Sequence, residues 1–443
     1  MENIMGIKVA KFGGSSVADT IQFTKVKDII LADKQRKYVV VSAPGKRFDQ
    51  DTKMTDLLYL CHTHIINHLP WEQLFQVVCD RFSAIAFTLG IGSDQLDLHA
   101  EYKKIRDAME DGAGPMFIAS RGEYLNGRLI AAYLGWDFID AANFIKFDER
   151  GKFLAEKTNE LLSEELKKHE NAVIPGFYGA GPDGKIVTFS RGGSDISGAI
   201  VARAANADVY ENWTDVHGFL TADPRIIDDP KPIEYISYQE LRELSYMGAS
   251  VLHEDAIFPV RESGIPINIR NTNDPEHPGT IILEKVPEGK TNIITGIAGS
   301  KDFVVIAMHK YMMNSERGFI RRLFAILDNF DISFEHMPTG IDTISVVIDS
   351  QVLGNKLPDI IDDIKRNLQP DSLDVYEDIA LIATVGQGMT YRPGVAAKLF
   401  TALADKGINI RMIDQGSSEI NIIVGVANKD FNDAIKAIYN AFN

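Results

Sequence analysis

The chain has 443 residues, a length that predicts two or three domains rather than one hydrophobic core. Apolar residues make up 45% and charged residues 24%, as in soluble globular proteins, and no apolar run approaches the about 18 residues that a membrane helix needs. The net charge of −16 argues against a general nucleic-acid binder, which requires clustered Lys and Arg, although a local cationic cleft could still hold an anionic substrate.

The first residues run directly into a strand-like pattern and lack the basic segment and apolar stretch of a secretory signal. Cys61 and Cys79 have apolar neighbours and no CxxC spacing, so we expect reduced, structural thiols rather than a disulfide or a zinc site. These features predict a cytoplasmic protein without a membrane or nucleic-acid partner.

The N-terminal region predicts a βαβ unit. Residues 7–12 alternate in the manner of a strand, the glycine-rich stretch 13–16 interrupts them, and an amphipathic helix follows over 17–30. Residues 38–43 form a continuous apolar run, which is typical of a strand buried on both faces of a parallel sheet. We therefore expect an α/β domain with helices on both faces of the sheet.

Further along, residues 55–110 are mostly helical in pattern, and 172–177 with 186–189 are predicted as a strand pair around a turn at 181–184. A second glycine turn at 191–195 then opens a predicted helix over 196–205. Strands are expected at 208–213 and 265–271, the first of them ending in Thr214 and Asp215.

A cluster of Pro, Gly, Lys and Thr at 287–292 predicts a domain boundary, and a repeat follows it. The segments around Gly318, Phe324 and Ile332 recur around Gly394, Phe400 and Ile408, always 76 positions later. Each copy predicts a small βαββ unit. The expected domains are therefore residues 1–290, 291–380 and 381–443, the last two forming a sensor pair.

Two glycine loops, KFGGSS at Lys11 and RGGSD at Arg191, each connect a strand to a helix, where backbone N–H groups and the helix dipole favour phosphate. Neither loop is a Walker or a GxGxxG motif, and one such loop alone is more often an ordinary turn. Here each loop carries a charged residue, Lys11 or Asp195, as phosphoryl transfer requires. An ionised carboxylate acceptor would need no general base.

Five motifs resemble, in order, the signature set of the aspartate kinases, and the resemblance covers nearly the whole chain. The motifs are KFGGSSV from Lys11, SRGEYLN from Ser120, SRGGSD from Ser190, WTDVHGFLTADPR from Trp213 and MGASVLH from Met247. The two repeats resemble the paired ACT domains of that family. The resemblance implies an amino-acid-kinase-like three-layer sandwich and phosphorylation of the side-chain carboxylate of L-aspartate by ATP.

The resemblance also implies roles for individual residues. Lys11 and Asp195 would be catalytic, Glu123 would receive the substrate ammonium, and Arg191 would bind the α-carboxylate through its guanidinium fork. For each residue the alternative is an ordinary structural role, such as a solvated lysine or a helix-edge ion pair. The remaining substrate positions are expected at Ser42, Thr55, Phe177, Gly192 and Ser194.

The nucleotide site implied by the resemblance includes Mg²⁺ carried by the phosphates, and no metal cage built from protein side chains is expected. Two positions depart from the family pattern: Ser250 replaces a lysine and Glu254 replaces a proline. The loss of a cation predicts either weaker nucleotide binding or compensation by Arg225 or Lys231. The expected ATP contacts are Gly13, Gly14, Ser15, Thr214, Asp215, Asp223, Arg225 and Ser250.

The paired ACT domains imply a homodimer or homotetramer and feedback by lysine or threonine, unless the repeats serve only to build the oligomer. Ile341 replaces an acidic residue found in some lysine-binding members, so the effector stays open. The expected effector positions are Met313, Ser315, Gly318, Phe319, Ser333, Glu335 and Thr339.

Two other functions remain as alternatives. A glutamate or N-acetylglutamate kinase would use the same loops, but an N-acetylated substrate would leave the Glu123 carboxylate without an ammonium partner. A catalytically silent amino-acid sensor is favoured only by Ser250, while Lys11, Glu123 and Asp195 together argue for catalysis.

Overall fold

The computed structural model describes residues 6–190, 192–249 and 258–442. It divides into two compact units. Unit 1 comprises the described parts of Met1–Phe219, Pro232–Tyr238 and Val251–Val286, and unit 2 comprises those of Leu220–Lys231, Gln239–Ser250 and Pro287–Asn443. The domain boundaries at 290 and 380 stay a prediction. No helix in the described part of the chain combines the length and apolar character needed to cross a membrane.

Unit 1 is built on an eight-stranded sheet in the order β3-β4-β2-β1-β7-β9-β10-β8. The strands from β3 to β9 are parallel to their neighbours, and β10 runs antiparallel to β9. The strands are β1 (Lys8–Phe12), β2 (Arg36–Val41), β3 (Asp137–Phe138), β4 (Ala172–Pro175), β7 (Val209–Thr214), β8 (Tyr235–Ser237), β9 (Ile267–Asn271) and β10 (Thr280–Leu283).

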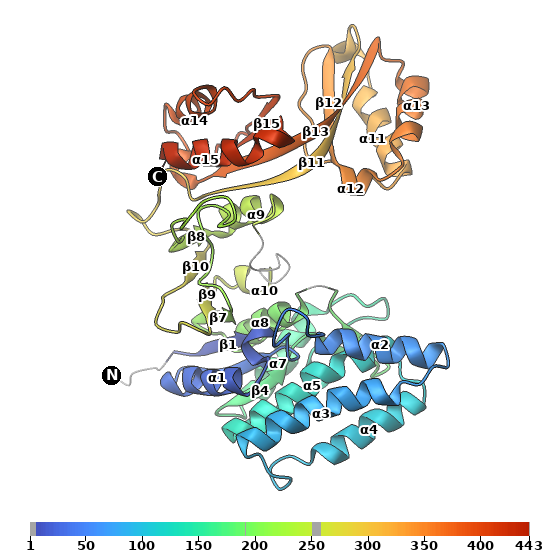
Figure 1. Ribbon diagram of the computed structural model, residues 1–443, viewed down its shortest axis with the longest axis vertical. Coiled ribbons are helices and arrows are strands. Elements are labelled where there is room, and N and C mark those ends of the chain that lie inside the picture. The colour runs from blue at the N-terminus through green and yellow to red at the C-terminus, as the bar shows by residue number, and fades with distance from the viewer. Residues whose placement is uncertain (1–5, 191, 250–257, 443) are drawn as a thin grey trace. The chain divides into compact units, whose positions relative to one another are not determined.

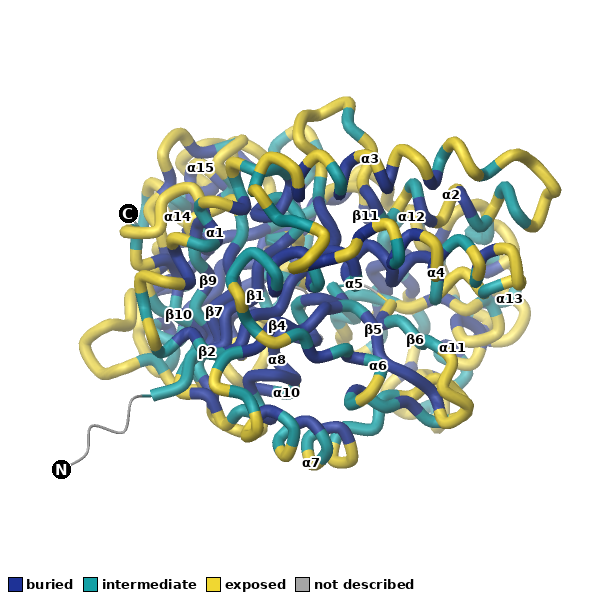
Figure 2. The backbone as a smooth tube through the Cα atoms, turned by 90° about the horizontal axis from the view of Figure 1, so that it is seen from below, coloured by how far each residue is buried: buried dark blue, intermediate teal, exposed yellow. Residues whose placement is uncertain are grey.

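Helices cover both faces of this sheet. They are α1 (Thr20–Ala32), α2 (Met54–Ile66), α3 (Glu72–Leu89), α4 (Leu98–Glu110), α5 (Pro115–Leu134), α6 (Ala141–Phe144), α7 (Ala155–Leu166), α8 (Gly193–Ala204) and α10 (Phe258–Arg261). Helix α5 packs on β2 and β4 and is joined by α2, α3 and α4, whereas α8 packs on β1, β2 and β7 and is joined by α7 and α10. Figure 2 shows α1 and α3 on one side of the strands and α7 and α8 on the other. The predicted three-layer α/β fold is confirmed.

The central strands are buried because both sheet faces are covered. Val39, Val40 and Val41 of β2 are fully buried, as their continuous apolar run predicts. The core beneath α5 draws on α1 to α5 together with β1, β2 and β4. This packing fixes the carboxyl ends of β1, β2 and β7, where ligands bind in open α/β sheets.

One predicted strand pair is wrong. Residues 186–189 were expected to pair with 172–177, but β4 (Ala172–Pro175) joins the main sheet beside β2. The antiparallel partner of β6 (Ile186–Thr188) is instead β5 (Tyr178–Ala180). Between β4 and β5 the chain turns at Phe177, whose φ of 78° breaks what looks in the sequence like one continuous strand.

Unit 2 contains a five-stranded antiparallel sheet in the order β12-β11-β13-β15-β14. Its strands are β11 (Gly296–His309), β12 (Thr343–Asp349), β13 (Ser372–Val385), β14 (Met412–Asp414) and β15 (Asn421–Ala427). Its helices are α9 (Tyr238–Tyr246, of which Tyr238 belongs to unit 1), α11 (Phe319–Asn329), α12 (Ser350–Leu353), α13 (Leu357–Leu368), α14 (Val395–Ala404) and α15 (Phe431–Phe442).

Strands β11 and β13 run through both repeats. The start of β11 pairs with the end of β13, and the end of β11 with the start of β13. Figure 1 shows α14 and α15 at one end of this long pair and α11 and α13 at the other. Ile294 and Ile297 accordingly belong to the core of the second repeat, although they lie at the start of the segment expected to form the first one.

The repeated strand-helix-strand arrangement is confirmed, with additions that the sequence pattern does not predict. Each repeat ends in a further helix, α13 or α15. In the first repeat the middle strand is reduced to isolated bridges at His336 and Thr339, whereas the second repeat has β14 at that place.

Candidate active site

Lys11 and Asp195 meet at the carboxyl end of the central strands. Lys11 lies on β1, is only 6% exposed, and its Nζ donates to Asp195 Oδ1 at 2.5 Å. Asp195 lies in the first turn of α8, and Asn212 Nδ2 on β7 donates to the same oxygen at 2.8 Å. A cation and a carboxylate 184 positions apart in the sequence therefore form one partly buried pair.

The first glycine loop packs backbone against backbone. Gly13 N donates to Trp213 O at 2.9 Å, and Gly45 N donates to Gly14 O at 2.8 Å. A Cβ added to Gly45 would lie 2.6 Å from Gly14 C, and one added to Gly14 would lie 3.1 Å from Ala43 O. Only glycines allow the loop after β1 and the loop after β2 to approach this closely. The exposed N–H groups of such loops make a cradle that suits phosphate.

The loop after β2 also meets Glu123 of α5. Ser42 N donates to Phe12 O at 3.1 Å, Asn126 Nδ2 donates to Ser42 O at 2.6 Å, and the backbone of Ala43 donates to the Glu123 carboxyl group. Glu123 is 5% exposed, and its Oε2 has no hydrogen-bond partner among the described residues. Burial raises the pKa of Glu123 to about 8, which the bond from Ala43 only partly offsets.

The second glycine loop packs against a strained phenylalanine. Phe177 has a φ of 78°, which is costly for a bulky side chain and is often found at functional sites. Its N–H donates to Ser197 Oγ at 3.0 Å and its carbonyl accepts from Phe189 N at 2.9 Å. A Cβ on Gly193 would lie 2.7 Å from the Phe177 ring, so the helix start and this residue are in direct contact.

The remaining predicted substrate positions lie in the same part of unit 1. A Cβ on Gly176, next to Phe177, would lie 2.8 Å from Ser194 Cα, and Gly192 is the left-handed N-cap of α8. Thr55 lies in the first turn of α2, where Met54 faces Gly122 of α5, one residue before Glu123. Arg191 lies outside the described residues.

The predicted nucleotide positions fall in both units. In unit 1, Ser15 lies in the short 3₁₀ helix Ser15–Val17, and Thr214 ends β7, with its Oγ1 donating to Asp215 at 3.2 Å. Asp223 and Arg225 belong to unit 2, where Arg225 Nη2 donates to Asp223 Oδ2 at 2.7 Å. Ser250, the position that departs from the expected lysine, lies outside the described residues.

A buried ionic network supports the strand that leads to Thr214. Glu211 of β7 accepts from Arg36 Nε at 2.6 Å and from Trp213 Nε1 at 2.9 Å, and Arg270 Nη1 lies 3.8 Å from it. Arg270 also stacks over the Trp213 ring at 4.6 Å. The network holds the end of β7 next to Gly13, whose N–H binds the Trp213 carbonyl.

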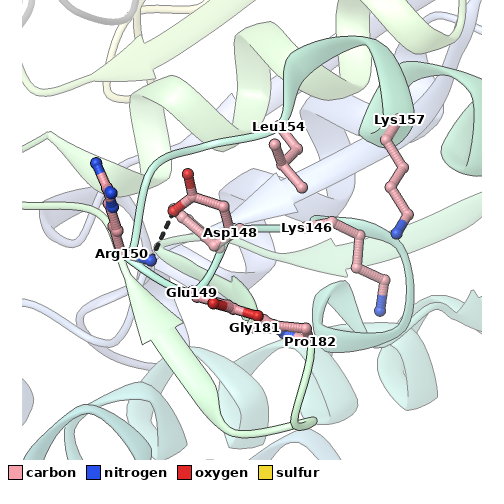
Figure 3. Close-up of a pocket in the computed structure, with 9 residues that line it drawn as sticks. Lys146, Asp148, Glu149, Arg150, Leu154, Lys157, Gly181 and Pro182 are labelled. Carbon is pink, nitrogen blue, oxygen red and sulfur yellow. Dashed lines mark hydrogen bonds between the residues drawn. The ribbon is translucent and has the colours of Figure 1, made fainter.

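A separate surface pocket of about 390 Å³ contains none of the predicted site residues. Lys146, Lys157, Asp148 and Arg150 are among the residues that line it, and Figure 3 shows their side chains around the opening. Burial, followed by the charge of Lys157, lowers the pKa of Lys146. Among the described residues, no group of three or more His, Cys, Asp or Glu could hold a metal ion.

The predicted effector positions cluster in the first repeat of unit 2. Met313 and Phe319 are buried in the same core as Ile332, and Gly318, with a φ of 76°, is the left-handed N-cap of α11. Ser315 lies in the 3₁₀ helix that begins at Met313. Ser333, Glu335 and Thr339 lie on the stretch beside β12, where Glu335 N donates to Val347 O at 2.8 Å.

Sequence patterns did not identify several residues of these sites. Asn212, which binds Asp195, could have been noticed as a polar residue inside a buried strand. Glu316 lies between Ser315 and Gly318 and pairs with Lys310 at 2.7 Å and with Arg322. The bond from Lys310 lowers the pKa of Glu316. Arg81 gives no local signal, because its partners lie 30 or more positions away.

Comparisons with known proteins find matches for both parts of the chain. The amino acid kinase family model matches residues 6–271, and an ACT domain model matches residues 382–442. Aspartokinase 3 of Bacillus subtilis is 36% identical over 455 residues, covering 98% of this chain and 98% of that protein.

Solved structures show the same similarity. The aspartate kinase of Clostridium acetobutylicum is 53% identical, with a TM-score of 0.92 over 99% of this chain and 100% of that one. Escherichia coli aspartokinase III is 25% identical over 98% of this chain and 99% of that one. Its TM-score is 0.74 in complex with aspartate and ADP and 0.76 with lysine and aspartate.

Proposed function

Because the chain belongs to the aspartate kinases of the amino acid kinase family, we propose that it transfers the γ-phosphoryl group of ATP to the side-chain carboxylate of L-aspartate. The product would be 4-phospho-L-aspartate. This reaction would be the first step in the biosynthesis of lysine, threonine and methionine, and an amino acid bound by the ACT domains would inhibit it.

The observation that carries this proposal is the buried Glu123 carboxyl group. Its Oε2 has no partner among the described residues, and the α-ammonium of an amino acid would supply one. An N-acetylated substrate has no ammonium and would leave the carboxyl group unpaired, which disfavours N-acetylglutamate. Arg191, although outside the described residues, is proposed to bind the α-carboxylate.

Lys11 is proposed to contact the transferring phosphoryl group. Its ammonium is already oriented by Asp195, so charge compensation needs little reorganisation when the substrates bind. The N–H of Gly14 would bind a phosphate oxygen, while Gly13, whose own N–H donates to the Trp213 carbonyl, would keep the loop close to the phosphates. The acceptor is an ionised carboxylate at neutral pH, so the transfer requires no general base.

The nucleotide partner is proposed from the glycine cradle and from the E. coli relative, which was solved with ADP. We propose that Mg²⁺ enters with the phosphates and supplies further charge compensation, with Asp195 helping to position the metal-nucleotide. Thr214, Asp215, Asp223 and Arg225 are proposed ATP contacts. Either Arg225 or Lys231 would supply the positive charge that the family's lysine provides and that Ser250 does not.

Lysine or threonine is proposed as the effector, and the E. coli relative was solved with lysine. Met313, Ser315, Gly318, Phe319, Ser333, Glu335 and Thr339 would line the effector pocket, and Glu335 would accept an ammonium. We further propose a homodimer or homotetramer assembled through the ACT domains.

The proposal is tested by incubating the purified chain with Mg-ATP and hydroxylamine, which converts an acyl phosphate into a hydroxamate. L-Aspartate, L-glutamate and N-acetyl-L-glutamate are compared, each with and without lysine or threonine. Of the three acceptors, we expect only aspartate to give hydroxamate, and either lysine or threonine to reduce the amount formed. In Lys11→Ala the rate of hydroxamate formation should fall by about 100-fold or more. ATP binding without hydroxamate from any acceptor would favour the silent sensor instead.

A further inference from the structure

Arg81 of α3 is a buried arginine whose side chain reaches out of the helical layer to the loops of the site. It is 7% exposed. Its Nη2 donates to Ala18 O at 2.9 Å and also to Gly45 O, and its Nη1 lies 3.3 Å from Asp51 Oδ2. A single guanidinium group therefore contacts three points of the chain, namely the loop after β1 and two places, Gly45 and Asp51, in the connection between β2 and α2.

Each of these three points lies in a segment that carries residues of the proposed site. Ala18 ends the phosphate loop that contains Gly13, Gly14 and Ser15. Gly45 ends the loop that follows β2 and begins with Ser42. Asp51 closes the loop that leads into α2, where Thr55 lies in the first turn.

Few other hydrogen bonds join these segments to one another. Gly45 N donates to Gly14 O at 2.8 Å, so a shift of Gly45 would move the phosphate loop. Asp51 is held by Arg47, whose Nε donates to Asp51 Oδ2 at 2.8 Å, and its side chain accepts from Arg47 N at 3.0 Å. These bonds shape the end of the connection between β2 and α2, whereas Arg81 ties that end to Gly45 and to the phosphate loop.

Burying a guanidinium group in the core has an unfavourable desolvation free energy. Burial lowers the pKa of Arg81, and its Nε has no hydrogen-bond partner among the described residues. Replacement of buried ion pairs by apolar side chains is often neutral or stabilising, so stability alone gives little reason for an arginine here. A planar group with several donors is, however, well suited to hold two carbonyls and a carboxylate at fixed separations.

We infer that Arg81 is a positioning residue for phosphoryl transfer: it holds the segment Gly13–Ser15, the segment Ser42–Gly45 and the start of α2 at Asp51–Thr55 at the mutual distances that the reaction requires. Arg81 itself contacts no reacting group. The role rests on the proposed function, since the three segments are assigned to phosphate and acceptor through it.

The test uses steady-state kinetics of the full chain with Mg-ATP and L-aspartate varied separately. In Arg81→Met we expect higher KM values for both substrates and a fall of about 100-fold in kcat/KM, because displacements of about 1 Å have effects of this size. Arg81→Lys keeps the positive charge but not the planar guanidinium with its several donors, and should recover part of the loss in kcat/KM. Asp51→Asn weakens one of the three contacts and should raise mainly the KM for aspartate.

The matched control is Val78→Ala, a fully buried apolar position on the same helix, whose side chain has no group that could donate a hydrogen bond to the loops. A merely destabilised enzyme has fewer active molecules, so Val78→Ala should lower the apparent kcat and leave both KM values unchanged. If Arg81→Met shows that same pattern, the positioning role is wrong. If Arg81→Met does not fold, Asp51→Asn becomes the test of the positioning role. Wild-type KM values in Asp51→Asn would then overturn the inference. An inactive wild type would instead refute the proposed function.

Discussion

Glu123 combines burial with a carboxyl group whose pKa is raised to about 8. Below that pH the free enzyme holds a neutral acid, whereas binding of a substrate ammonium requires the carboxylate. We therefore expect the KM for aspartate to fall as the pH rises from 6 to 8, by at most about tenfold per unit, and to level off above. Initial-rate measurements over this range, with saturating Mg-ATP, would show the slope.

Glu123→Gln is the control for this prediction, because the amide keeps the shape and cannot ionise. Its KM should be high and should not follow this slope between pH 6 and 8. The same raised pKa makes the stability of the fold depend on pH. The contribution of the protonated Glu123 to the free energy of unfolding is complete below about pH 4.5. It is lost as the pH rises to 8, by up to about 1.4 kcal/mol per pH unit. A wild-type stability curve parallel to that of Glu123→Gln would contradict the assignment.

At the residue scale, the sequence predicts charges that belong to motifs but not the partners that orient them. Lys11 and Asp195 could be proposed as a pair because each accompanies a glycine turn, and the structure brings them within 2.5 Å. The partners of Asn212 and Arg81 escape such reasoning, although Asn212 itself is noticeable as a polar residue within a buried strand. Their partners are chosen by the sheet order and by helix packing, which place distant segments side by side.

At the element scale, the contact between the loops after β1 and β2 depends on the absence of a side chain at Gly45. A methyl group there would lie 2.6 to 2.8 Å from the Gly14 and Ser15 backbone, so the loops would have to separate. We expect Gly45→Ala to reduce kcat/KM by about 100-fold and the free energy of unfolding by about 1–3 kcal/mol. Kinetics and urea unfolding on the same preparation measure both.

Gly114→Ala provides the comparison, because an added Cβ at Gly114 meets no atom within 4 Å and its φ is −72°. This N-cap position of α5 should cost at most about 1 kcal/mol and leave kcat/KM unchanged. Equal kinetic effects in the two variants would show that the close approach of the loops is not needed for turnover.

The elements that the sequence predicts correctly are those with a strong local pattern. The apolar run of β2 and the glycine-to-helix transition at α8 are examples. The division of 172–180 into β4 and β5 had a signal in the Pro175-Gly176 dipeptide, which is typical of a turn, but the apolar residues around it favoured one strand. The left-handed backbone at Phe177 is imposed by its contacts with Ser197, Phe189 and Gly193.

At the scale of the whole molecule, regulation requires that the effector distinguish between two states of the enzyme. Glu335 is the proposed acceptor for an effector ammonium. Loss of its charge should remove a bond worth about 1.5–3 kcal/mol, so Glu335→Gln should raise the half-inhibitory concentration about 10- to 100-fold. Activity without effector should stay at the wild-type level. Inhibition curves for lysine and threonine measure this change.

Glu377→Gln is the control for this effect. Glu377 is an exposed residue of β13 in the same unit, and its loss changes the net charge equally. If both variants shift the inhibition curve alike, the effect reflects general electrostatics and not a pocket at Glu335.

The repeat also shows the limit of sequence reasoning at this scale. A constant offset of 76 positions reveals two related modules, but it represents each as a continuous segment. The pairing of β11 with β13 along their full lengths places residues from the start of the expected first module in the core of the second. Such sharing of strands leaves no trace in the spacing.

This interleaving has a consequence for synthesis. Ile294 and Ile297 emerge from the ribosome before the rest of the first module, yet Leu399 and Ile435, which share a core with them, are translated after it. In the meantime a strand rich in apolar residues lacks its final neighbours and is open to chaperones or to mispairing with another nascent chain. The yield of native enzyme should therefore depend on how quickly the second module follows the first during translation.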